Sequence, residues 1–65
     1  MMYAIACKFP DQNRFQTINI HTGRQVNNWM YCTLFQSREK AVKTLKQIET
    51  VVIPGVELKV IKYKG

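Results

Sequence analysis

Apolar and polar residues alternate near the start of the chain in the pattern of two β-strands. In residues 2–9 every second side chain is bulky, which places four of them on one face: Tyr3, Ile5, Cys7 and Phe9. Residues 15–20 alternate in the same way, with Ile18 and Ile20 directed inward. Residues 10–13 combine a proline with Asp and Asn, which is typical of a turn. The pattern therefore predicts two strands joined by a turn.

The next apolar segment, residues 29–35, differs because both of its alternating faces are apolar. It follows a predicted turn at residues 21–24, where Gly23 can adopt a positive φ without steric cost. Its odd positions hold Trp29, Tyr31, Thr33 and Phe35, and its even positions hold Met30, Cys32 and Leu34. A strand with one face in water would not show this pattern. The segment is predicted to be a strand with other groups packed on each side.

A helix is predicted to begin after Ser37, a favourable N-cap residue, and to end before Pro54. Glu39 in the first turn suits the helix dipole. One narrow face of this helix is apolar, with members at helical spacing: Ala41, Leu45, Ile48 and Val52. The opposite face carries Lys40, Lys43 and Lys46. Such a row is typical of a solvated face, and its functional interpretation is a stripe for phosphates or an acidic partner.

A final alternating run, residues 56–64, completes the order β-β-β-α-β. The prediction is a single α+β domain over residues 1–65, with a mostly antiparallel four-stranded sheet and one helix packed on one face. A right-handed helical crossover would bring the last strand parallel to the first or the third, and we expect the strand order 3-2-1-4. The expected helix-facing core comprises Ile18 or Ile20, together with Leu45, Ile48, Leu58 and Val60.

One helix covers only one face of such a sheet, so the other face is the predicted contact surface. The first and third strands carry apolar residues on both faces, and the last strand adds Ile61 and Tyr63 opposite to Leu58. An uncovered apolar sheet face is a liability unless it binds something. The alternative is that Ala4, Ala6 and scattered aromatic residues leave an ordinary semi-polar surface.

The charge balance favours an anionic partner. Ten Lys and Arg residues against four Asp and Glu residues give a formal net charge of +6 in 65 residues, and 46% of the residues are hydrophobic. Such a balance favours association with nucleic acid, an anionic surface or an acidic protein, and it says nothing about the fold. A chain this short is expected to lack the walls of a deep catalytic cleft.

The leading hypothesis is a basic, non-enzymatic accessory protein that contacts nucleic acid. Exposed aromatic side chains can stack on bases while nearby cations contact phosphates. The stacking candidates are Trp29, Tyr31 and Tyr63. The phosphate candidates are Arg14, Arg24, Lys59 and Lys62, with Lys40, Lys43 and Lys46 on the helix. No RNP-type motif accompanies them, and the likeness to small domains that lay a three-stranded sheet in the DNA major groove is a fold-level analogy only.

The alternative hypothesis is a protein-interaction module. Trp29 and Tyr31 are large anchors of the type that carries interface energy. The module would be a homodimer joined through the open sheet face, or a small bacterial or phage inhibitor that docks on a larger, acidic protein. Salt separates the two hypotheses, because screening weakens phosphate contacts and leaves apolar burial intact.

No residue pattern predicts catalysis, a metal site or a cofactor. Two separated cysteines, Cys7 and Cys32, and the single histidine, His21, are too few donors for a closed metal site. Both cysteines fall inside predicted strands, where thiols are usually inert. The sequence shows no glycine-rich phosphate loop, and no pair of carboxylates is predicted to converge. With no signal peptide and no apolar run of membrane-spanning length evident, we expect a cytoplasmic protein with reduced thiols.

Overall fold

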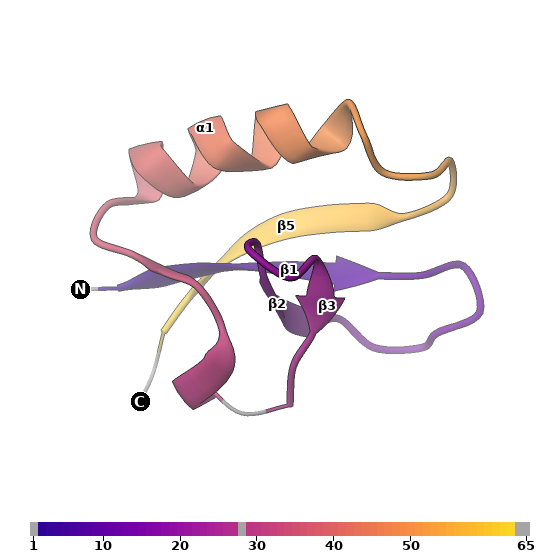
Figure 1. Cartoon of the computed structure of the whole chain (residues 1–65), viewed down its shortest axis with the longest axis horizontal. Helices are drawn as coiled ribbons and strands as arrows, with labels where there is room; N and C mark the ends of the chain where they lie inside the picture. The colour runs from indigo at the N-terminus through magenta and orange to yellow at the C-terminus, as the bar shows by residue number, and fades with distance from the viewer. Residues whose placement is uncertain (1, 28, 64–65) are drawn as a thin grey trace.

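The structure, a computed structural model, describes residues 2–27 and 29–63, with the backbone alone at Trp29. It contains one α-helix and an antiparallel sheet (Figure 1), as the α+β prediction required. The elements in chain order are β1 (Tyr3–Lys8), β2 (Gln16–Asn19), β3 (Arg24–Gln25), the 3-10 helix η1 (Trp29–Tyr31), β4 (Leu34–Phe35), α1 (Arg38–Glu49) and β5 (Glu57–Lys62). The predicted order β-β-β-α-β is confirmed, with the short β3 and η1 as additions.

β1 is the central strand of the sheet. β5 pairs antiparallel with all six residues of β1 and so occupies one of its edges. The other edge is shared, because β2 pairs with Ala6 and Cys7 while β4 pairs with Tyr3 and Ala4. β3 extends the sheet beyond β2 as the second arm of a hairpin.

The relative directions of the strands correct part of the predicted topology. β4 and β5 are both antiparallel to β1, so they are parallel to each other and are connected by α1. Of the two predicted alternatives, the one that made the last strand parallel to the third predicted strand is therefore right. The last strand is antiparallel to the first, so the other alternative is wrong. The predicted order 3-2-1-4 is right in placing the first strand between the second and the last. It is wrong for the third strand, whose ladder lies on β1.

The predicted strand over residues 29–35 is wrong except at its end. Residues 29–31 form η1, and only Leu34 and Phe35 pair as a strand. Side chains supply hydrogen bonds that a ladder would otherwise make: Asn19 Nδ2 donates to the carbonyl of Tyr31 (2.9 Å), and Thr33 Oγ1 accepts from the backbone N–H of Ile20 (3.0 Å). Apolar residues on both alternating faces therefore did not mark a strand packed on both sides. Met30 is 78% exposed.

α1 forms as the sequence predicts. Ser37 caps it, because its Oγ accepts from the backbone N–H of Lys40 (3.2 Å). The helix ends at Glu49, well before Pro54, so Val52 lies beyond it. α1 contacts β5, β1 and β4, and Figure 1 shows it lying along β5 and β1. Among the described residues no helix has the length and apolar character needed to cross a membrane.

Two glycines allow the tight turns at the ends of the sheet. Gly23 has φ +71° and donates its backbone N–H to the carbonyl of Asn19 (2.8 Å), which closes the β2–β3 hairpin. Gly55 has φ +94°, and a Cβ at this position would lie 2.9 Å from Cγ of Pro10. The turn before β5 thus packs against the turn after β1, and only glycine fits there.

The core lies between α1 and the sheet. Ile5, Cys7 and Ile18 are buried at its centre, with exposed fractions of 1%, 5% and 6%. Half-buried apolar side chains surround them: Phe9, Ile20, Phe35, Leu45, Ile48, Val56 and Leu58. Both Ile18 and Ile20 belong to this core, as do the predicted Leu45, Ile48 and Leu58. Val60, also predicted, is half-buried and pairs in register with Ile5.

Candidate functional site

The face of the sheet that points away from α1 carries the most distinctive surface among the described residues. Ile5 and Cys7 of β1 point into the core, so the alternate residues Ala4 and Ala6 point to the opposite face. In register beside them lie Ile61 and Lys59 of β5. On this side the central strand carries the small, buried side chains of Ala4 and Ala6, with Lys8 at its end, and longer side chains flank them.

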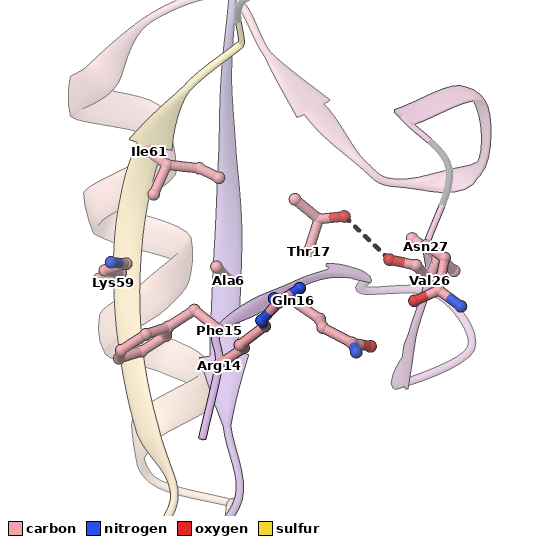
Figure 2. A pocket seen from close by; sticks show the side chains of 9 residues that line it. All are labelled: Ala6, Arg14, Phe15, Gln16, Thr17, Val26, Asn27, Lys59 and Ile61. Atoms are coloured by element: carbon pink, nitrogen blue, oxygen red, sulfur yellow. Dashed lines mark hydrogen bonds between the residues drawn. The ribbon is translucent and has the colours of Figure 1, made fainter. Parts of the chain in front are cut away.

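These flanking side chains enclose a hollow of about 400 Å³ (Figure 2). Its floor includes Ala6 and Thr17, which pair directly between β1 and β2. One side is formed by β5, through Ile61, and the other by the segment after β3, through Val26. Thr17 Oγ1 donates to the carbonyl of Val26 (3.2 Å), so this second side is tied to the sheet.

The hollow is positively charged. Arg14 and Lys59 line it and are exposed, and none of the carboxylates in the described chain lines it. The carboxylate of β5, Glu57, forms an ion pair with Lys8 (Nζ to Oε2, 3.1 Å). That pair offsets its own charges, and among the described residues neither Arg14 nor Lys59 forms an ion pair.

Phe15 links the two strands at the end of the hollow. The Nζ of Lys59 lies 4.1 Å from the centroid of the Phe15 ring, a cation–π contact. Arg14 precedes Phe15 directly in the chain and also lines the hollow; Figure 2 shows the Phe15 ring directed toward β5 and the Arg14 side chain extending away from it. The contact fixes the direction of a lysine side chain that would otherwise be flexible.

Two side-chain amides also line the hollow, Gln16 and Asn27. Within the part of the chain that the structure describes, no hydrogen bond engages either side chain. Two other amides nearby have hydrogen-bond partners. Gln12 and Gln25 bond each other through both their amide groups (2.8 and 2.9 Å), and Gln25 also donates to the carbonyl of Cys7 (3.0 Å). Besides the two cations and the Thr17 hydroxyl, the hollow therefore has the amide donors and acceptors of Gln16 and Asn27.

Phe15, the ring beside this hollow, was not among the predicted stacking residues. Tyr31 is 61% exposed on η1, and Tyr63 is half-buried after β5; neither lines the hollow. The side chain of Trp29 lies outside the described residues. The sequence did contain a signal for Phe15, since it alternates with Ile18 and Ile20 and so falls on the outward side.

The predicted phosphate contacts are spread over several surfaces. The structure brings together Arg14 and Lys59. Lys62 is exposed on β5, but by alternation it points to the side of Leu58 and Val60. Arg24 is exposed on β3. The helix lysines Lys40, Lys43 and Lys46 are exposed on α1, in the other layer of the molecule.

The cysteines are placed for packing. Burial raises the pKa of the Cys7 thiol, and a hydrogen bond with Gln25 only partly offsets this effect. Burial likewise raises the pKa of Cys32, with smaller opposing hydrogen bonds. Neither cysteine forms a disulfide bond within the described residues, and the reactive thiolate is disfavoured in each. The described residues contain no group of three or more His, Cys, Asp or Glu side chains that could hold a metal ion.

A second, smaller pocket of about 220 Å³ lies on the helix side of the sheet, at the C-terminal end of α1. It is lined by apolar groups that include Ile20, Ile48 and Val51. Val51 is 80% exposed, and Ile53, which follows it, is 64% exposed. The exposed aliphatic surface therefore gathers at this end of the helix.

No protein-family model, curated protein or solved structure matches this chain.

Proposed function

We propose that this protein is a non-enzymatic binding module that contacts nucleic acid through the hollow on its open sheet face. The observation that carries the proposal is the pairing of Arg14 and Lys59 at a site that no described carboxylate lines. An uncompensated cationic hollow beside an aromatic ring suits a ligand that is both anionic and partly planar. We expect the protein to act in the cytoplasm, where cysteine thiols stay reduced.

The contact would act mainly through phosphates. Each lysine or arginine that meets a phosphate releases condensed counterions, so affinity falls linearly with salt on a double-logarithmic plot. The net charge of +6 attracts the polyanion from a distance, whichever face it approaches. The hollow differs from the rest of the basic surface because two cations, Arg14 and Lys59, line the same recess.

The test is a pair of double variants that remove the same charge from opposite layers. Arg14→Gln with Lys59→Gln removes both cations of the hollow, while Lys40→Gln with Lys46→Gln removes two exposed lysines of α1. Fluorescence anisotropy with labelled oligonucleotides, at several salt concentrations, measures the affinity of each variant and of the unmodified protein. The hollow variant should lower the salt slope for single strands by about 1.4, from two contacts at about 0.7 each. The helix variant should change it far less.

Equal losses in the two variants would mean that only overall charge matters, and the hollow would not be the site. Absence of binding by the unmodified protein at low salt would overturn the proposal altogether. Circular dichroism of each variant confirms that the fold is retained, which is expected because all four side chains are exposed.

A protein-interaction module is the second candidate, and one specific feature favours it. The exposed Val51 and Ile53 lie at the end of α1, beside the apolar pocket. Exposed aliphatic side chains gathered at a pocket are a common feature of protein-binding surfaces. This candidate differs from the homodimer expected through the open sheet face, because the apolar surface lies on the helix side. Self-association that persists in high salt, with no oligonucleotide binding at low salt, would favour it over the first proposal.

A further inference from the structure

We infer that the hollow on the open sheet face admits one unpaired base, so that the nucleic acid it binds is single-stranded. This inference rests on the proposed function and adds to it the class of nucleic acid and the part of it that enters the site. It depends on the size of the hollow, on the groups that line it and on the state of its aromatic ring.

The shape of the site excludes a double helix from its interior. A protein that reads duplex DNA inserts a protruding helix or β-ribbon into a groove. Here the site is recessed, because β1 contributes only the small and buried side chain of Ala6 beneath the hollow, while longer side chains rise on both sides. A volume of about 400 Å³ is near the lower end of the range for small-molecule pockets, which suits one planar group. A base held within a duplex would pass over the hollow without entering it.

The lining matches the different parts of one nucleotide. Val26 and Ile61 provide apolar surface on the two sides, toward which the faces of a base can pack. Gln16 and Asn27 each offer a donor and an acceptor, and no hydrogen bond among the described residues uses either amide. These groups complement the edge of a base, which is free only in an unpaired strand. Arg14 and Lys59 remain for the phosphates on either side.

The state of Phe15 argues against open stacking as the means of capture. One face of its ring is covered by the ammonium group of Lys59 at 4.1 Å. A base would have to displace that cation to stack there, and would lose a phosphate contact in doing so. Phe15 is therefore a positioning residue for Lys59, and the base enters the hollow beside it.

The test compares three labelled nucleic acids of equal length at low salt: a mixed-sequence single strand, its duplex, and a strand in which abasic spacers replace the bases. The unmodified protein should bind the single strand roughly tenfold more tightly than the abasic strand, the order expected from apolar contact with one base and one or two hydrogen bonds to its edge. The duplex should bind no more tightly than the abasic strand. This comparison uses one protein and does not depend on the folding of any variant.

A variant then assigns the preference to the hollow. Gln16→Met with Asn27→Leu removes both amides while keeping the charge and approximate volume. This variant should lower the affinity for the single strand to that for the abasic strand. Its affinity for the abasic strand should equal that of the unmodified protein. Gln47→Met, on the exposed surface of α1, is the matched control and should change neither.

The outcomes separate this inference from the proposed function. Equal binding of the single strand and the abasic strand, or tighter binding of the duplex, overturns the unpaired-base site and leaves nucleic-acid binding standing. An amide variant that folds and retains the full preference for bases also overturns it. Failure of all three nucleic acids to bind at low salt refutes the proposed function, and the inference falls with it.

Discussion

Ile5 should contribute more to stability than any other single side chain in the described structure. It is the largest side chain that is fully buried, with an exposed fraction of 1%, and it lies at the centre of the core. Truncation to alanine removes three carbons and leaves a cavity, which costs about 2–5 kcal/mol. A domain of this size rarely has more than about 3–5 kcal/mol of stability to lose. Ile5→Ala is therefore expected to leave the protein largely unfolded in water.

Ile5→Val gives a graded form of the same experiment. Loss of one methyl group should cost about 0.5–1.5 kcal/mol. With a urea m-value of roughly 1 kcal/mol/M, the unfolding midpoint should fall by about 0.5–1.5 M at unchanged m. The matched control is Ile53→Val, the same change at a side chain that is 64% exposed, which should stay within about 0.5 kcal/mol. Equal midpoint shifts in the two valine variants would refute the placement of the core.

Three further changes probe a turn, a cap and a buried thiol. Gly55→Ala should destabilise by roughly 1–3 kcal/mol in urea unfolding, because φ is +94° and the new Cβ would meet Pro10; an unchanged midpoint would contradict this turn. Ser37→Ala should cost about 1 kcal/mol by losing the bond from Lys40, whereas Ser37→Asp should retain most of it. Burial raises the pKa of the Cys7 thiol in the folded protein. The stability gained by burying the protonated thiol is therefore complete below the ordinary thiol pKa and is lost as pH rises through the folded-state pKa. Cys7→Ala should make the alkaline decline in unfolding free energy shallower, and an identical decline would refute this assignment.

The parts of the fold that the sequence predicted well are those set by local interactions. The cap at Ser37 and the hairpin turn at Gly23 each depend on residues within a few positions of one another. Backbone conformations of this kind are restricted by residue type, so they can be inferred without the rest of the chain. The apolar face of α1 was likewise visible from helical spacing, and its buried residue Ala41 lies on that face.

The errors concern pairings between distant segments. Nothing near residues 29–35 indicates that the chain there would satisfy its backbone through side chains of the second strand, such as Asn19. Nor does alternation show that two strands would share one edge of β1, since each pairs over only two positions. Such pairings depend on loop geometry and on competition among edges, which a pattern of apolar residues does not encode.

For the candidate site, charge alone pointed to Arg14 and Lys59 but did not distinguish them from the other basic residues. The distinction is tertiary: both lie on the open face, while the helix lysines and Lys62 do not. Phe15 could have been placed on the outward side by its alternation with Ile18. Gln16 and Asn27 carried no signal, because an amide becomes informative only when its neighbours leave it without a partner.

The choice of small residues on the open face of β1 has a consequence for stability. A domain of 65 residues buries little apolar surface, and larger side chains in its central strand would bury more. Yet Ala4 and Ala6 stand where β1 faces away from the helix, whereas Ile5 and Cys7 fill the other side. A bulky residue in place of Ala6 would occupy the hollow that Arg14 and Lys59 border. Ala4 and Ala6 are themselves buried, with exposed fractions of 0% and 1%, so their small size sets the depth of the recess. Stability given up in a central strand in this way is typical of a binding site. The alternation of alanine with larger residues along β1 thus supports the same face for binding as the distribution of charge.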